Sequence, residues 1–88
     1  MAYTLVPTKQ FQKRLLRLTQ QERNQVRNKL DILAENPYHP SLRTKSIQGE
    51  KDLMECSVNM DIRILWYYEN DRVILLIDIG HHDILKRF

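Results

Sequence analysis

The sequence predicts a small α+β domain: a short strand and two helices, followed by a three-stranded antiparallel meander. Apolar residues recur at helical spacing in the first 36 residues, and the second half contains three short apolar runs separated by turns. Helices and strands segregated along a chain are typical of the α+β class. At 88 residues, the chain is expected to form a single domain over residues 1–88.

The N-terminal region is expected to form an edge strand and a first helix. Residues 3–6 form a short apolar segment before Pro7, and Thr8 has a side chain that can cap a helix. Apolar residues then recur at the spacing of one helix face: Phe11, Leu15 and Leu18.

A second helix is expected to follow almost without a loop, which makes an antiparallel helical hairpin. Thr19 and Glu22 have the spacing of a capping box, and the residue before Pro37 disfavours helical geometry. The predicted buried face of this helix consists of Val26, Leu30 and Leu33. Both helices are expected to cover one face of the sheet.

The second half of the chain is expected to contain the sheet. Residues 36–52 read as a polar connection, and the following apolar runs predict strands over residues 53–58, 62–68 and 72–79. The last strand is almost entirely apolar, which is typical of a strand buried on both faces. Gly80 is expected to end it.

Composition and charge restrict the class of protein. The net charge is +3, and residues 9–29 contain seven basic residues against the single acid Glu22. A basic half indicates a polyanionic or acidic partner, although a solvated helix face explains the same charges. The only cysteine, Cys56, cannot form an intrachain disulfide, and no apolar run is long enough for a bilayer. A cytoplasmic protein without membrane contact is expected.

Arg63 is the first candidate for chemistry, because it lies between Ile62 and Ile64 in an apolar strand. A charge in such a strand is unfavourable unless it faces solvent or a partner. The guanidinium group can donate two parallel hydrogen bonds to a phosphate. An ordinary outward-facing arginine is the alternative.

Candidate residues for acid–base chemistry lie in the segments before and after this strand in the sequence. His81 and His82 follow the last predicted strand, and imidazole suits proton transfer near neutral pH. Asp61 precedes Arg63 by two residues, so both would share a face of an extended strand. Glu55, on the neighbouring strand, could orient a histidine or act as a base. The alternatives are a polar strand end for the histidines, a turn aspartate and a solvent-facing glutamate.

The order of these segments resembles the RelE/ParE toxin superfamily over nearly the whole chain. The helical hairpin follows a short first strand, as in that family. Three further segments carry the resemblance: LRTKSIQG at residues 42–49, DIRILWYY at 61–68 and IDIGHHDIL at 77–85. The histidine-bearing end is more similar to the YafQ-like and RelE-like RNases than to the gyrase-poisoning ParE toxins.

The resemblance implies a ribosome-associated endoribonuclease that cuts mRNA in the ribosomal A site and is silenced by a cognate antitoxin protein. The ribose 2′-hydroxyl would attack the adjacent phosphate, without a metal or a small-molecule cofactor. The resemblance places Arg63 at the family's phosphate-contacting arginine. It also matches His82 to the terminal histidine that acts as acid or base, with His81 helping or exchanging roles.

The connection before the sheet supplies candidates for binding RNA. Arg43, Lys45 and Lys51 are expected to flank the cleft and contact phosphates of mRNA or ribosomal RNA, although each is also explained as a surface charge. Met54 and Cys56 stand where RelE has two lysines, so the chain departs from a lysine-rich site. A ParE-like gyrase inhibitor and an inactive binding module of the same fold are the alternative functions.

Overall fold

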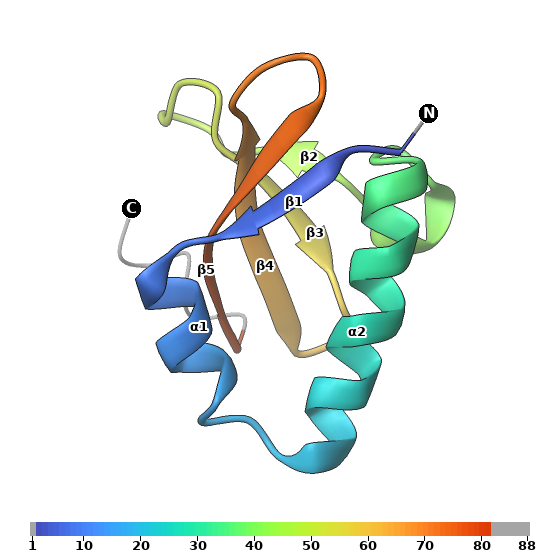
Figure 1. Ribbon diagram of the computed structural model, residues 1–88, viewed down its shortest axis with the longest axis vertical. Helices are drawn as coiled ribbons and strands as arrows, with labels where there is room; N and C mark the ends of the chain where they lie inside the picture. Colours follow the sequence, from blue (N-terminus) through green and yellow to red (C-terminus); the bar gives the residue numbers. More distant parts are fainter. Residues whose placement is uncertain (1, 82–88) are drawn as a thin grey trace.

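The computed structural model describes residues 2–81 (Figure 1). The α+β class and the predicted order of elements are confirmed. Along the described residues the elements are β1 (Thr4–Pro7), α1 (Lys9–Leu15), α2 (Gln20–Glu35), the 3-10 turn η1 (Pro40–Leu42), β2 (Lys45–Ser46), β3 (Met54–Ser57), β4 (Ile62–Tyr68) and β5 (Val73–His81).

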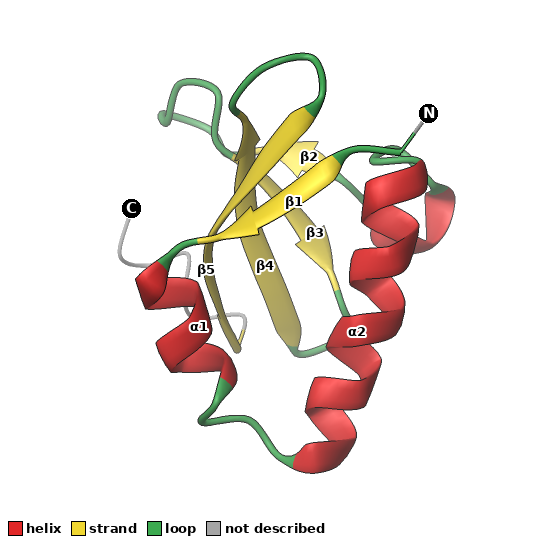
Figure 2. Cartoon of the chain, in the orientation of Figure 1, coloured by secondary structure: helices red, strands yellow, loops and turns green. Residues whose placement is uncertain are grey.

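The strands form one sheet in the order β1-β5-β4-β3-β2 (Figure 2). The predicted antiparallel meander is its centre, because β4 pairs with both β3 and β5. β1 is an edge strand as expected, and it pairs in parallel with β5. The polar connection predicted over residues 36–52 contains a strand that was not predicted, since Lys45 and Ser46 pair with Glu55 and Met54 as the other edge strand. So short a strand exists only through this pairing.

Both predicted helix caps are present. The Thr8 side chain accepts a hydrogen bond from the Phe11 backbone N–H at 3.2 Å. At α2, the Thr19 hydroxyl accepts from the Glu22 N–H at 3.1 Å, and the Glu22 carboxylate accepts from the Thr19 N–H at 2.8 Å. These reciprocal bonds satisfy two donors that a helix start leaves without partners, so they fix where α2 begins.

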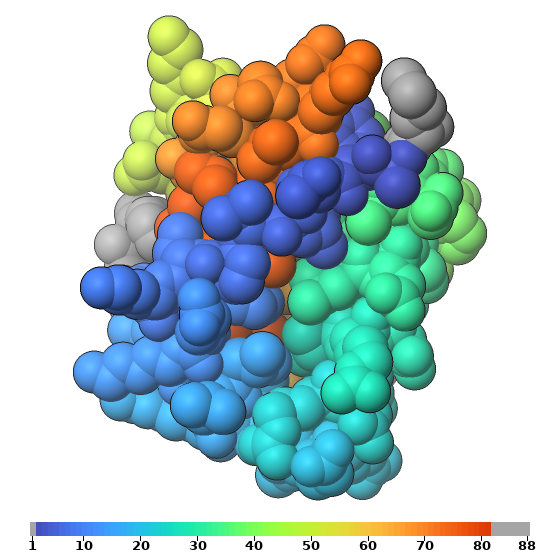
Figure 3. Space-filling view, in the orientation of Figure 1, coloured from blue at the N-terminus to red at the C-terminus, as the bar shows by residue number. Residues whose placement is uncertain are grey.

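The helices run in opposite directions and lie apart, α1 against β5 and α2 against β1 and η1 (Figure 1). Both helices lie on the same face of the sheet, of which β1 is an edge strand (Figure 3). The main core unites this face with both helices, and its largest fully buried side chains include Phe11, Leu33, Ile64 and Trp66. A smaller cluster of Leu53 and Leu65, with Ile47 and Ile77 against it, forms apart from this core.

β5 differs from its prediction in length and burial. It continues through Gly80 to His81, because Gly80 pairs with Arg63 and His81 pairs with Ile62. Its buried residues alternate with half-buried ones as far as Asp78, so it is not buried on both faces. The strand also has an irregularity in pairing, in which Leu65 faces Asp78 and Trp66 faces Leu76.

Beyond the point where β1 stops pairing with β5, the N-cap residue of α1 and α1 itself continue the contact with β5. The Thr8 hydroxyl donates to the carbonyl oxygens of Leu76 and Ile77 at 2.9 and 3.1 Å. Asp78 is fully buried, and its carboxylate accepts from Gln10 Nε2 at 2.8 Å and lies 3.2 Å from Arg14 Nε. A buried carboxylate needs such partners, so this network anchors α1 to β5. No helix within residues 2–81 has the length and apolar character needed to cross a membrane.

Candidate functional site

Arg63 lies on β4 between Ser57 of β3 and Gly80 of β5. Its side chain is half-buried, and Nη1 donates to the carbonyl oxygens of Asn59 at 2.8 Å and Ile62 at 3.2 Å. These bonds hold one end of the guanidinium group against the turn that joins β3 to β4. The group is therefore positioned before any ligand binds.

The β3–β4 turn is itself well determined. The Asn59 side-chain oxygen accepts from the backbone N–H groups of Asp61 and Ile62, each at 2.8 Å. Such an Asx turn mimics a backbone turn and is a common role of asparagine. The Asn59 amide also donates to Gln25 Oε1 of α2 at 2.7 Å, so the turn is tied to the second helix.

A pocket of about 200 Å³ opens beside this turn. We call it the β3–β4 pocket; it is lined by Lys29, Ser41, Arg43, Ser57, Val58, Asn59, Met60 and Arg63. Among residues 2–81, its lining includes three cationic residues, two serines and one asparagine but no acidic residue. This composition suits an anion with several oxygen acceptors.

His81 belongs to a different cluster. Its Nε2 lies 3.5 Å from Asp61 Oδ2 and 3.6 Å from Glu22 Oε2. The hydrogen bond from the Thr19 backbone lowers the pKa of Glu22, and the nearby His81 contributes to the same shift. The imidazole thus faces one carboxylate in the first turn of α2 and one in the turn before β4, and either can accept its N–H and orient the ring.

The described residues do not bring His81 and Arg63 onto one phosphate. His81 pairs with Ile62 and Arg63 pairs with Gly80, so alternation along the strands directs the two side chains to opposite faces. The expectation that Asp61 shares a face with Arg63 also fails, because Asp61 lies in the turn before β4 and approaches His81. His82 lies outside the described residues.

Glu55 does share a sheet face with Arg63, since Glu55 pairs with Leu65 and Ser57 pairs with Arg63. It is only 3% exposed, so the alternative of a solvent-facing glutamate was wrong. Lys45 Nζ lies 3.3 Å from one carboxylate oxygen of Glu55, and the other oxygen is buried without a hydrogen-bond partner among residues 2–81. The pair fixes Glu55 on the face that carries the arginine.

Only one of the three predicted RNA-binding cations joins Arg63. Arg43 lines the β3–β4 pocket, whereas Lys45 is engaged by Glu55. Lys51 lies in the exposed loop before β3, at the opposite end of that strand from the β3–β4 turn (Figure 1). Lys29 was missed, because nothing in the sequence separates it from the other basic residues of the helices.

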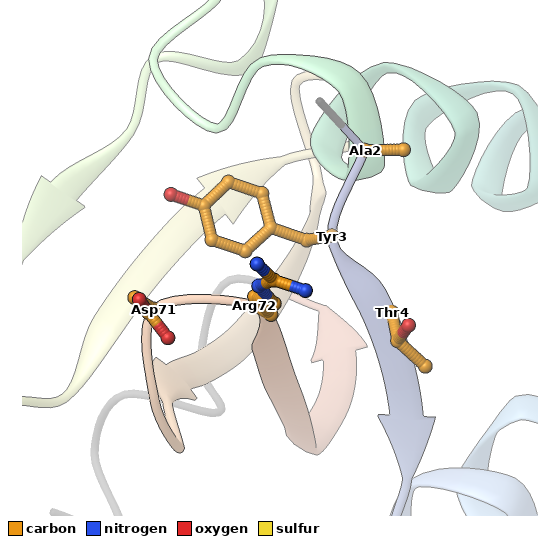
Figure 4. Close-up of a pocket in the computed structure, with 5 residues that line it drawn as sticks. All are labelled: Ala2, Tyr3, Thr4, Asp71 and Arg72. Carbon is orange, nitrogen blue, oxygen red and sulfur yellow. The ribbon is translucent and has the colours of Figure 1, made fainter.

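Two other features carry no candidate chemistry. Burial raises the pKa of the Cys56 thiol to about 12, which makes it a poor nucleophile. A second pocket, of about 450 Å³, lies between β1 and the β4–β5 turn (Figure 4). There the Tyr3 ring extends toward Asp71 and Arg72, at the end of β5 away from His81. No group of three or more histidine, cysteine or acidic residues in the described part of the chain could hold a metal ion.

Glu22 gives a test of the capping box at the start of α2. Its pKa is lower in the folded chain than its ordinary value of 4.5, so the ionised carboxylate stabilises the fold above that pH. This contribution is lost as the pH falls through the folded pKa. We therefore expect Glu22→Gln to lower the melting temperature at pH 7, with the difference from wild type shrinking below about pH 4.5.

The matched control is Glu35→Gln at the exposed end of the same helix. Thermal melts at several pH values should show no comparable loss at pH 7 in that variant. A Glu22→Gln difference that stayed constant down to pH 3 would contradict the contribution of the ionised carboxylate.

Together these features define a small α+β domain with a cationic pocket at one end of its sheet. No family model matches the sequence, and no similar sequence was found among curated proteins. Similar solved structures exist. They include the toxin–antitoxin complex RelBE2 from Mycobacterium tuberculosis, with a TM-score of 0.78 and 15% identity over 93% of this chain and 100% of that chain.

Two further structures have the same fold. The archaeal RelE–RelB complex from Pyrococcus horikoshii gives a TM-score of 0.74 and 22% identity over 92% of this chain and 96% of that chain. The DinJ–YafQ toxin–antitoxin complex from E. coli gives a TM-score of 0.74 and 18% identity, covering 97% and 98%. The chain therefore has the fold of the RelE/ParE toxin superfamily, and the resemblance seen in its sequence is confirmed at the level of the fold.

Proposed function

We propose that the chain is the toxin of a type II toxin–antitoxin system and a ribosome-associated, metal-independent endoribonuclease that cleaves mRNA and so inhibits translation. The fold shared with the RelE and YafQ complexes supports a toxin. The observation that carries the nuclease proposal is the position of Arg63, which is held in a cationic pocket beside Gly80 of β5, and no acidic residue among residues 2–81 lines this pocket.

The proposed reaction needs a cation, a base and an acid. The ribose 2′-oxygen attacks phosphorus, the bond from phosphorus to the 5′ oxygen breaks, and a 2′,3′-cyclic phosphate and a 5′-hydroxyl end result. Arg63 stabilises the negative charge that develops on the phosphate. Its Nη1 is bonded to the β3–β4 turn, which leaves the other guanidinium N–H groups to donate to the phosphate oxygens.

Proton transfer is assigned to the adjacent histidines His81 and His82, with His82 as the acid or base. The ring of His81 is engaged by Asp61 and Glu22 on the helix face, which disfavours His81 for this role. Glu55 shares the face of Arg63 and can orient an imidazole there. Arg63 and His82 are therefore the proposed principal catalytic residues, and His81 and Glu55 are proposed to support them.

The proposed partners follow from this assignment. mRNA in the ribosomal A site and ribosomal RNA would contact the cations around the β3–β4 pocket. A cytoplasmic location is part of the same proposal. The basic residues of α1 and α2 would bind a cognate antitoxin, because an acidic protein segment complements their charge. A toxin–antitoxin pair is the composition of the similar RelE and YafQ structures.

Controlled induction of the chain in cells, followed by mapping of mRNA 5′ ends, tests the proposal. We expect new 5′-hydroxyl ends within translated messages, and their loss when ribosomes are cleared from the mRNA before induction. Co-expression of a neighbouring antitoxin gene should suppress them. Intact messages with arrested replication would favour a ParE-like gyrase inhibitor, and neither effect would indicate an inactive binding module.

A further inference from the structure

We propose that the β3–β4 pocket binds a single phosphate group of the RNA backbone, with Lys29 of α2 as a phosphate ligand beside Arg43 and Arg63. The inference rests on the proposed function for the identity of the polymer as RNA. It adds to that function a residue from the helical layer and the other donor-bearing residues that line the same pocket.

The electrostatics of the pocket favour an anion. Lys29, Arg43 and Arg63 line one hollow, and none of them forms a salt bridge within residues 2–81. Like charges that face one space repel each other, and more strongly where the protein displaces water. An anion in the pocket removes this repulsion, so binding is coupled to a gain in stability.

The donors converge from separate elements. Lys29 comes from α2, Ser41 and Arg43 from η1 and its end, Ser57 from β3, and Arg63 from β4. The bond from Asn59 to Gln25 fixes the turn against α2, so the helix and strand sides of the pocket keep their positions. Convergence of side chains held by different elements is typical of a preorganised site.

Size and charge favour one phosphate of a polymer. The volume of about 200 Å³ is below the roughly 300–1,000 Å³ of pockets that enclose whole small molecules. Hydroxyl and guanidinium donors suit the oxygens of a phosphate. RNA also brings negative charge at each neighbouring phosphate, whereas a single carboxylate of a protein partner would leave more of the cationic charge unbalanced.

The test measures binding separately from cleavage. The probe is a fluorescent single-stranded RNA with 2′-O-methyl groups, which lacks the attacking hydroxyl. We expect Lys29→Gln to weaken binding about tenfold, as for a lost charge-assisted hydrogen bond. The slope of log K against log salt concentration should become less steep by an amount that corresponds to about one phosphate contact. Lys29→Arg should retain most of the affinity.

The control Lys9→Gln removes the same charge from an exposed position on α1 outside the pocket. It should change affinity less than twofold. In parallel, inorganic phosphate at constant ionic strength should raise the melting temperature of wild type and Lys9→Gln, but not of Lys29→Gln or Arg43→Gln. Circular dichroism verifies that each variant is folded.

Equal RNA affinities for Lys29→Gln and Lys9→Gln would overturn the inference. The inference would also be overturned if polyglutamate competed with the RNA probe while inorganic phosphate left the melting temperature unchanged. That result would assign the pocket to an acidic protein. Stabilisation by phosphate without RNA binding would assign it to the free ion and overturn the RNA ligand. Lys29-dependent RNA binding without any cleavage activity would support the inference and refute the nuclease, so the two failures are distinguishable.

Discussion

Replacing Arg63 by alanine is expected to reduce mRNA cleavage by roughly two to three orders of magnitude, the usual loss for one donor to a developing oxyanion. The guanidinium group is held at the rim of the β3–β4 pocket by its bonds to Asn59 and Ile62. A group positioned in advance needs no reorganisation when charge develops on the phosphate, so its removal should act on the chemical step. Single-turnover cleavage of a defined mRNA on purified ribosomes measures this effect.

Two matched variants separate catalysis from charge and folding. Arg63→Lys keeps the charge but not the planar fork, so it should recover only part of the lost rate. Arg72→Ala removes an exposed arginine just before β5, at the opposite end of that strand from Gly80, and should retain activity. A folded Arg63→Ala protein that cut at the wild-type rate would remove Arg63 from the mechanism.

Local sequence signals predicted the elements that depend on neighbouring residues. Thr8 and Thr19 were correctly predicted as helix caps, because each side chain accepts a hydrogen bond from a backbone N–H only three residues later. Elements that depend on distant partners were not predictable in this way. β2 exists through its pairing with β3, and Gly80 continues β5 because Arg63 lies opposite it, 17 positions earlier in the chain.

The residues of the functional site show the same difference between local sequence signals and dependence on distant partners. Arg63 was predictable, because a charge between two isoleucines is unusual in a strand. Lys29 was not, because its role depends on a turn about 30 residues further along the chain, which only the fold brings to α2. The burial of Glu55 was likewise invisible, since an acid among apolar strand residues is more often exposed.

The histidine pair gives the second large effect. We expect His82→Ala to lower the cleavage rate by about 10²–10⁴-fold, the range for loss of a general acid or base, and His81→Ala to change it only a few-fold. The structural reason for the small effect expected at His81 is the register of β5. His81 is directed to the helix face with Asp61 and Glu22, whereas Arg63 is directed to the opposite face.

Cleavage on programmed ribosomes should therefore rank wild type and His81→Ala close together, with His82→Ala and the double variant equally impaired. Thermal melts supply the control, because the exposed contacts of His81 with Asp61 and Glu22 contribute little to stability and all four proteins should stay folded. The reverse ranking, with His81 essential and His82 dispensable, would place proton transfer on the helix face. Arg63 and the β3–β4 pocket would then serve RNA binding rather than the reacting phosphate.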